Sequence, residues 1–154
     1  MNIKIRKATE SDFESIFSLV HELAVFQGSP ERIINSVKQM KADKEFFQCF
    51  VAETESKEIV GMASFFFAYY TWVGKSLFLD DLYVKKSHRG QKIGSLLLEK
   101  IVDLARQENC KRVRWFVSRW NEPALEFYKK IGVEVDEEVL VCDLEGKRLN
   151  EFKI

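Results

Sequence analysis

The sequence contains few cysteines and prolines: three and two, respectively, among 154 residues. Cys49, Cys110 and Cys142 are widely spaced and odd in number, so the close pairs that zinc sites and disulfide frameworks need are missing. We expect reduced thiols in or near the core and no metal. A catalytic cysteine would need a nearby histidine, and His21 and His88 are the only two, so we rank that interpretation far below a structural one.

Neither charge sign is in excess, because lysine plus arginine and aspartate plus glutamate both number 24. No basic field therefore exists to attract nucleic acid or anionic lipid, and we expect neither partner. No run of about 18 apolar residues occurs, and residues 1–7 carry charges where a signal peptide would have its apolar stretch. We expect a cytoplasmic protein.

Hydrophobic residues make up 46% and charged residues 31% of the chain, as in globular proteins, and 13 phenylalanines predict an aromatic core. The length suits one domain over residues 1–154, and no repeat or linker divides it. Apolar spacing and turn residues place the elements. The expected helices start at about 9–13, 30, 93 and 121, and the expected strands cover about 3–5, 46–53, 59–70, 77–84, 113–117, 133–141 and 149–152.

The most informative segment, residues 84–95, follows an expected strand and opens an expected helix. Free backbone N–H groups and the helix dipole make such a position suitable for phosphate oxygens. Gly90 and Gly94 would let the backbone approach a ligand, and Arg89 adds a permanent charge. On glycine spacing alone, a plain loop before a helix is an equally good interpretation. The common nucleotide-binding glycine motifs are absent.

Residues 89–94, Arg-Gly-Gln-Lys-Ile-Gly, resemble the acetyl-CoA pyrophosphate loop of the GNAT superfamily, commonly Arg/Gln-x-x-Gly-x-Gly/Ala. Residues 79–84 resemble that family's fourth strand, and residues 120–129 resemble its last conserved helix. From about residue 3 to residue 132 the chain resembles the diamine (spermidine/spermine) and thialysine N-acetyltransferases. The resemblance implies an α/β (α+β) fold with a mixed, mostly antiparallel central sheet of six to seven strands, splayed strands four and five, and about four helices.

The same resemblance implies acetyl-CoA as cosubstrate. Leu82, Tyr83 and Val84 would offer main-chain contacts to the thioester and the pantetheine arm. Asn121 and Lys129 are further expected contacts, with helix capping and surface charge as the alternatives. The loop residues expected at the diphosphate are Arg89, Gly90, Gln91, Lys92, Ile93, Gly94 and Ser95. Lys92 replaces the usual middle glycine, so its backbone must accept a side chain while its ammonium reaches the phosphates.

Tyr128 matches the family tyrosine that protonates the departing thiolate, although a core aromatic is the alternative without the family. Asp80 matches the carboxylate that takes the amine proton, through water, and Asp81 would hold the cationic substrate. An ordinary amine has a pKa of about 10 and an ordinary aspartate one of about 4, so desolvation must narrow the gap. Adjacent strand residues point to opposite faces, so both aspartates line one cleft only if a bulge lies beside them.

Three further residues bear on which amine the chain accepts. Trp72 resembles a substrate-site aromatic of the branch, with packing as the alternative. Gln27 and Tyr70 stand where polyamine-specific members place acidic residues, which disfavours a long polyamine. The acidic residues at 134 and 136–138 are better explained as a solvated strand edge than as a substrate attractor.

We therefore predict an N-acetyltransferase acting on a primary amine of a small molecule, either a diamine, a polyamine or a lysine-like amino acid, by direct attack in a ternary complex. A peptide or protein N-acetyltransferase is the nearest alternative, and a non-catalytic acetyl-CoA-binding regulatory module is the second. The branch also implies a homodimer.

Overall fold

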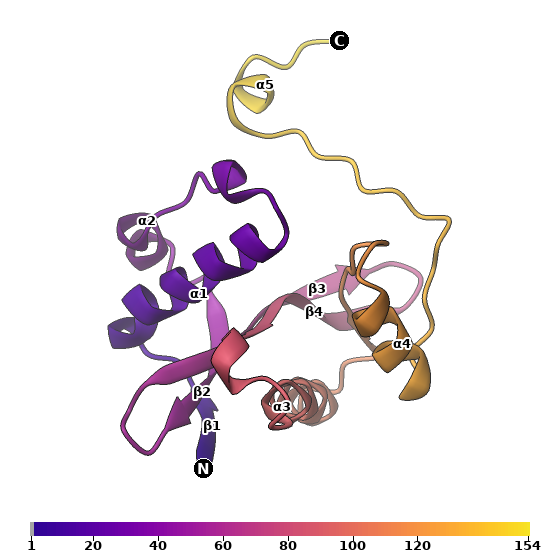
Figure 1. The fold of residues 1–154 in the computed structure, drawn as a ribbon. Coiled ribbons are helices and arrows are strands. Elements are labelled where there is room, and N and C mark those ends of the chain that lie inside the picture. The colour runs from indigo at the N-terminus through magenta and orange to yellow at the C-terminus, as the bar shows by residue number, and fades with distance from the viewer. Residues whose placement is uncertain (1) are drawn as a thin grey trace. The chain divides into compact units, whose positions relative to one another are not determined.

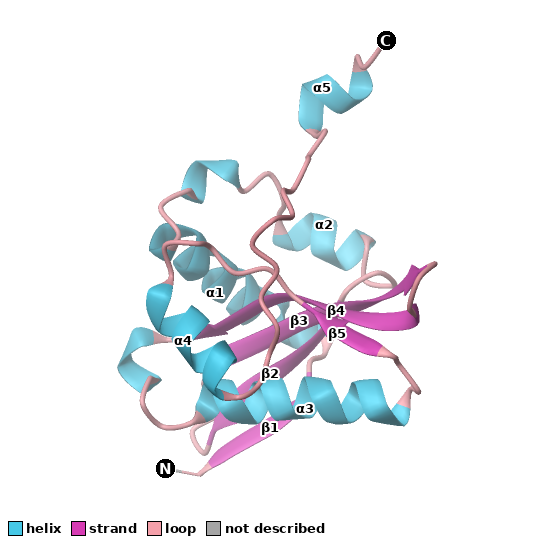
Figure 2. Cartoon of the chain, turned by 90° about the vertical axis from the view of Figure 1, so that its right-hand side faces the viewer, coloured by secondary structure: helices cyan, strands magenta, loops and turns pink. Residues whose placement is uncertain are grey.

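The computed structural model describes residues 2–154 and divides them into two compact units, one ending at Phe116 and the other spanning Val117–Ile154 (Figures 1 and 2). The expectation of a single domain over 1–154 stays a prediction. The first unit contains β1 (Ile3–Lys7), η1 (Glu10–Asp12), α1 (Phe13–Phe26), η2 (Pro30–Arg32), α2 (Val37–Ala42), β2 (Gln48–Thr54), β3 (Ile59–Tyr70), β4 (Gly74–Val84), η3 (Lys86–His88), α3 (Ile93–Gln107) and β5 (Arg112–Arg114). The second contains α4 (Glu122–Lys130) and α5 (Gly146–Asn150).

The sheet of the described residues has five strands in the order β1-β2-β3-β4-β5. All neighbours are antiparallel except β4 and β5, which are parallel. The mixed, mostly antiparallel sheet was predicted correctly, but six to seven strands was wrong. Residues 133–141 form no strand, and residues 149–152 fall at the end of α5 and beyond it. Alternating apolar residues predict a strand only where a neighbouring backbone is there to pair with.

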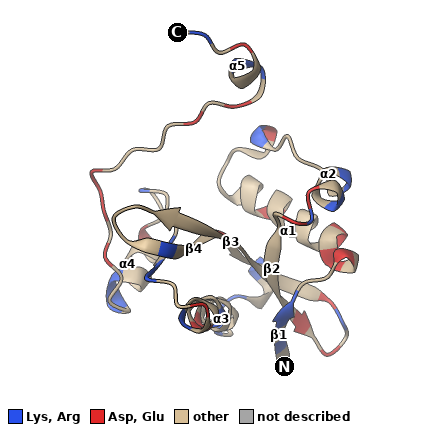
Figure 3. Ribbon diagram, turned by 180° about the vertical axis from the view of Figure 1, so that it is seen from behind, with Lys and Arg blue, Asp and Glu red and all other residues tan. Residues whose placement is uncertain are grey.

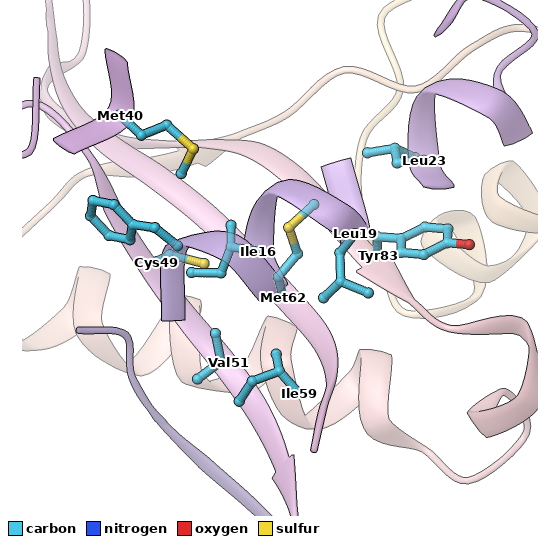
Figure 4. Packing of buried hydrophobic residues seen from close by; sticks show 10 residues of the cluster. Ile16, Leu19, Leu23, Met40, Cys49, Val51, Ile59, Met62 and Tyr83 are labelled. Carbon is cyan, nitrogen blue, oxygen red and sulfur yellow. The ribbon is translucent and has the colours of Figure 1, made fainter. Parts of the chain in front are cut away.

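Helix α1 packs its apolar stripe on one face of the sheet (Figure 4). Ile16 and Leu19 are fully buried there against Val51 and Met62. We call this sheet face, which also carries Cys49 and Tyr83, the α1 face. The helix start predicted near residue 9 is confirmed: the Asp12 carboxylate accepts the Thr9 N–H at 2.7 Å, and η1 leads directly into α1.

Helix α3 lies on the opposite sheet face, as Figures 1 and 2 show, and we call this the α3 face. Its residues Ile93, Leu97 and Ile101 are buried at helical spacing, as predicted. Gly61 on β3 permits the close approach, because a Cβ there would lie 3.2 Å from both the Leu97 Cδ1 atom and the Tyr83 carbonyl oxygen.

The second predicted helix starts later than expected. Pro30 opens only the single 3-10 turn η2, and α2 begins at Val37. The Ser36 hydroxyl accepts the Gln39 N–H at 3.1 Å, so the capping serine rather than the proline sets this helix start.

In the second unit, Asn121 caps α4 by accepting the Ala124 N–H at 3.4 Å, and Gly132 follows the helix with a positive φ of 83°. Both features agree with the predicted helix. Beyond it the chain exposes apolar side chains, among them Leu140 at 83%. Cys142 is exposed, so its expected place in or near the core was wrong.

Charges of both signs are interspersed along the helices, as Figure 3 shows. On β1, the Arg6 guanidinium forms short ion pairs with the Asp12 and Glu53 carboxylates, at 2.8 and 2.6 Å. Hydrogen bonds from Arg6 hold the pKa of Asp12 down at about 2. Among the described residues, no helix is long and apolar enough to span a membrane.

Replacing Gly61 with alanine tests the packing of α3 against the sheet. The added Cβ would lie 3.2 Å from the Tyr83 carbonyl oxygen, and this backbone atom cannot move away as a flexible side chain can. Gly61→Ala should therefore lower the free energy of unfolding by about 1–3 kcal/mol in chemical denaturation. Gly94→Ala is the matched control, because its Cβ would lie 3.9 Å from Val84 and should cost little. Equal stability of both variants would contradict the close approach.

Candidate active site

A β-bulge sets the position of the two aspartates on β4. Leu79 pairs with Phe65 and Asp81 pairs with Ser64, so Asp80 is the extra residue without a partner on β3. The sequence required a bulge beside the aspartates if both were to serve one site, and the structure has it there. Because of the bulge, Asp81 shares the α1 face with Ser64 instead of pointing to the α3 face.

Burial removes water from both carboxylates and raises the pKa of each. Removal from water, then the nearby charge of Asp80, raises the pKa of Asp81 from 3.8 to about 6, although the Ser64 hydroxyl donates to its Oδ2 at 3.3 Å. Asp80 is exposed at its surface, yet the surrounding protein still desolvates its carboxylate enough to raise its pKa. A base with a raised pKa accepts a proton from an amine more readily than an ordinary aspartate does.

Beyond the bulge, one edge of β4 is open. The parallel pairing with β5 covers only Ser76 to Phe78, so residues 79–84 have no strand on the β5 side within residues 2–154. The predicted splaying of strands four and five is thus present. Leu82, Tyr83 and Val84 lie on this open segment, and the Tyr83 side chain is buried on the α1 face with its hydroxyl 3.3 Å from the Glu22 carboxylate. Main-chain contacts from this edge need no side-chain movement.

The loop after β4 leads to free amides at the start of α3. Leu96 is the first residue of this turn with a backbone partner, its N–H bonding to the Lys92 carbonyl at 3.0 Å. The preceding amides of Ile93, Gly94 and Ser95 have no hydrogen-bond acceptor among the described residues. A 15-residue helix with three unpaired N–H groups suits anionic oxygens.

Lys92 stands where the family's loop usually has a glycine, so the sequence predicted that the backbone there must accept a side chain. Its φ of 61° and ψ of 10° lie in the left-handed region that favours glycine. The exposed lysine therefore keeps the backbone shape that the usual glycine would give. Gly90, with φ 77°, also needs this freedom, whereas Gly94 does not, because a Cβ there would make only an ordinary contact.

Arg89 is held toward α1. Its Nε donates to the Val84 carbonyl at 3.1 Å, and its guanidinium lies 5.1 Å from the Phe26 ring centroid and 5.4 Å from that of Tyr83. These contacts leave the guanidinium exposed beside the loop. Neighbouring Gln91 is exposed as well.

The structure does not bring all predicted acceptor residues to the aspartates. Trp72 is 98% exposed in the turn between β3 and β4. That turn follows the Tyr70–Gly74 pair, which is six residues, or about 20 Å, along β3 from the Ser64–Asp81 pair. Gln27 ends α1 and is exposed. The predicted role of Trp72 at the acceptor stays a prediction.

The remaining predicted residues belong to the second unit. Tyr128 is half-buried on α4, with its ring centroid 5.7 Å from that of Phe127. Asn121 serves as the α4 cap, and the Lys129 ammonium lies 3.9 Å from the Glu137 carboxylate. The alternatives of capping and surface charge are therefore realised, and coenzyme contacts by these two residues stay predictions. The acidic stretch around Glu137 is a solvated loop, not a strand edge.

Neither of two surface hollows in the first unit contains Asp80 or Asp81. One, of about 550 Å³, lies beside the loop and is lined by Glu22, Glu58, Lys85, Lys86 and Ser87. The other lies near the start of α1 and reaches Cys49, whose burial raises the pKa of its thiol to about 12. A thiol with that pKa is no nucleophile, which supports the structural interpretation of Cys49.

Comparison with known proteins gives this arrangement a family. Residues 11–133 match the model of the acetyltransferase (GNAT) family, which is most of the chain. The chain belongs to the GNAT acetyltransferase family. It is therefore an acyltransferase of the class that uses acetyl-CoA as cosubstrate, and the resemblance seen in three sequence motifs is confirmed.

Named relatives of this GNAT chain act on amines. It is 34% identical over 143 residues to a thialysine N-epsilon-acetyltransferase of Bos taurus, covering 86% of this chain and 84% of that protein. The Caenorhabditis elegans thialysine N-epsilon-acetyltransferase is 30% identical, with coverage of 98% and 97%. A crystal structure of a transcriptional regulator from Bacillus halodurans is similar in fold, with a TM-score of 0.77 and 25% identity over 92% of this chain and 99% of that one.

Ser64 and Glu22 contact predicted site residues, Asp81 and Tyr83, and the sequence indicated neither contact. The strand register places Ser64 opposite Asp81 beside the bulge. Glu22 accepts a hydrogen bond from the Tyr83 hydroxyl. Both contacts join residues far apart in the chain, so no local pattern announces them.

Lys92 offers a test of whether backbone shape or side-chain charge governs the loop. Lys92→Gly keeps the left-handed conformation and should bind CoA within about fivefold of wild type, because one exposed charge contributes little. Lys92→Val should bind CoA at least about tenfold more weakly, since a β-branched residue resists φ of 61°. Calorimetry with CoA measures both. Loss of binding in the glycine variant as large as in the valine variant would contradict the backbone role.

Asp81→Asn tests the desolvation of the carboxylate pair. Because folding raises the Asp81 pKa from 3.8 to about 6, the acid form is favoured in the native state, and stability falls as pH rises through that window. The asparagine variant should be more stable than wild type by about 1–2 kcal/mol at pH 7.5 and equal to it near pH 4. Thermal unfolding across pH measures the difference. Asp103→Asn, at an exposed carboxylate on α3, is the control, and a pH-independent difference for Asp81→Asn would refute the shift.

Proposed function

We propose that this chain transfers the acetyl group of acetyl-CoA to a primary amine of a small molecule, a diamine, a polyamine or a lysine-like amino acid, by direct attack in a ternary complex. The observation that carries the proposal is the bulge at Asp80. It brings two partly desolvated carboxylates to the point where the β4 edge opens, just before the anion-binding start of α3. The names of the relatives support an amine acceptor.

The coenzyme site is proposed along the open edge of β4 and the loop that follows. The free amides of Ile93, Gly94 and Ser95 would donate to diphosphate oxygens, and the α3 dipole favours that charge. Arg89 would add a permanent positive charge, and Lys92 an exposed ammonium. Backbone N–H groups between Leu82 and Val84 would polarise the thioester carbonyl, as donors aimed at a developing oxyanion do.

The acidic pair is proposed to receive the acceptor. An amine is protonated at pH 7 and unreactive, so it binds first as a cation, and Asp81 supplies the opposite charge. Asp80, exposed and one residue away, would take the proton through a water molecule, after which the neutral nitrogen attacks the thioester carbon. The raised pKa of both carboxylates reduces the energetic gap for this transfer.

Tyr128 is proposed to return a proton to the departing CoA thiolate. A phenol has a pKa near that of a thiol, so the transfer is close to balanced. This role rests on the match of residues 120–129 to the last conserved helix of the family, and α4 is present there as a helix.

We propose that the chain acts as a homodimer. Exposed apolar side chains support this, with Trp72 at 98%, Leu140 at 83% and Phe152 at 58%. Such groups gain free energy when a second copy covers them. Sedimentation that finds only monomer at micromolar concentration would remove the homodimer. The cytoplasmic location stays a prediction.

The experiment is a turnover screen with acetyl-CoA and a panel of diamines, spermidine, lysine and peptides, read by CoA release and product mass. We expect acetylation of small amines, and Tyr128→Phe should lower kcat by about 100-fold because the leaving thiolate loses its acid. The Kd for acetyl-CoA should stay within about threefold, since a single hydroxyl contributes little to that binding. Tyr69→Phe, which removes a hydroxyl from an exposed tyrosine on β3, is the matched control.

Three outcomes would reject parts of the proposal. Faster acetylation of peptides than of small amines would support the protein N-acetyltransferase. Binding of acetyl-CoA without turnover of any amine would support the regulatory module. Wild-type kcat in Tyr128→Phe would remove the tyrosine from its role as acid.

A further inference from the structure

Two arginines of β5 share the sheet face of Asp81. Arg112 lies opposite Ser76 and Arg114 opposite Phe78, and both pairs are on the same side because strand side chains alternate with period two. The β3 register puts Phe78 opposite Phe66 and Asp81 opposite Ser64, so this side is the α1 face. Along it, an acidic site at the bulge is followed by a basic site at β5.

Both guanidiniums gather at a single ring. The Cζ atom of Arg112 is 4.3 Å and that of Arg114 5.0 Å from the Tyr70 ring centroid. Two like charges within reach of one ring repel each other, and the ring's electron-rich face offsets only part of that cost. Two positive charges therefore lie close together on β5.

Neither arginine has a counter-ion among residues 2–154. Arg6, Arg106 and Arg119, in contrast, each pair with a carboxylate. The Arg112 Nε atom is buried and lacks any hydrogen-bond partner. A guanidinium without a carboxylate partner is costly when it is partly buried, so an anion that accepts from the terminal N–H groups of these arginines would be bound favourably.

Aromatic rings cover the face between the acidic and basic sites. The Phe66 and Phe78 rings stack with centroids 5.0 Å apart, and Phe116 packs edge-on to Phe78 at 5.0 Å. Phe66 is 42% and Phe116 62% exposed. This surface suits the methylene chain of a ligand whose two ends are charged and opposite in sign.

We infer that Arg112 and Arg114, supported by Tyr70, form a subsite for the carboxylate of the acceptor, so that the preferred acceptor is an amine that carries a carboxylate at its other end. The inference rests on the proposed amine acetylation at Asp80 and Asp81. A diamine would place its second cation beside two arginines and be repelled. The subsite thus selects by charge against diamines and polyamines that are long enough to reach it.

The spacing along the strands sets the length of the acceptor. Asp81 lies opposite Ser64 and Phe78 opposite Phe66, so the bulge leaves only two strand steps, or about 7 Å, between them. Arg114 lies one strand, about 4.8 Å, further across the sheet, which separates the Asp81 and Arg114 backbones by about 8 Å. An extended chain advances about 1.25 Å per bond, so six to eight bonds between nitrogen and carboxylate carbon span about 7.5–10 Å. Lysine and 6-aminohexanoate lie at the lower end of this range and 8-aminooctanoate at the upper.

The test compares ω-amino acids of four to eight carbons and lysine with diamines and alkyl monoamines of equal length. For wild type, kcat/KM should be highest for the amino acids of six to eight carbons. Arg114→Gln and Arg112→Gln should each lower kcat/KM for these by about 10-fold or more, the value of a charge-assisted hydrogen bond, and leave the monoamines unchanged. Arg106→Gln, on exposed α3, is the control. Equal losses for acids and monoamines, or none for acids, would overturn the subsite.

A binding measurement separates this inference from the proposed function. Hexanoate and octanoate carry the carboxylate without the amine, so their affinity, measured by NMR titration of the acetyl-CoA-free protein, needs no turnover. Binding that weakens about 10-fold in Arg114→Gln supports the subsite even if no amine is acetylated. Hexanoate and octanoate binding that is undetectable, or equal in wild type and Arg114→Gln, refutes the subsite even if diamines are acetylated.

Discussion

The register shift between β3 and β4 is the constraint on which the site depends. If the pairing continued without the shift, Asp80 would pair with Ser64 and Asp81 with Ala63, so that Asp81 would point toward α3 and Tyr83 would leave the α1 core. One inserted residue therefore decides which face carries the carboxylates. Burial stabilises this register, because Tyr83 is packed in the core on the α1 face and a slip of β4 would remove it from there.

The bulge also separates two kinds of backbone along β4. Residues 76–78 are paired on both edges, whereas residues 79–84, which include the bulge, have only β3 as a neighbouring strand within residues 2–154. Unpaired backbone N–H groups need an acceptor, and a ligand that passes along that edge supplies one. A loop joins this segment to α3, whose first backbone amides are free. The open β4 edge and the start of α3 therefore both offer N–H donors to an extended anionic molecule.

Local patterns predicted the parts of this structure that depend on neighbours in sequence. The strand 59–70, the helix from Ile93 and the capped helix at Asn121 follow from periodicity and capping residues, and each is present. The left-handed backbone at Lys92 came from the resemblance, which marked a glycine position. In contrast, Ser64 facing Asp81 and the gathering of Arg112 and Arg114 at Tyr70 depend on strand register. Register is set by packing across the whole sheet, so no short segment encodes it.

The strands wrongly predicted after Gly132 show that apolar periodicity alone does not determine where a strand forms. Val139, Leu140 and Val141 are apolar, yet in the isolated chain they are exposed by 65%, 83% and 56%. Apolar residues that remain in water gain nothing from an extended conformation until a second surface removes them from solvent and a neighbouring strand pairs their backbone. The predicted strand is absent because no neighbouring strand within residues 2–154 pairs with the backbone of this segment.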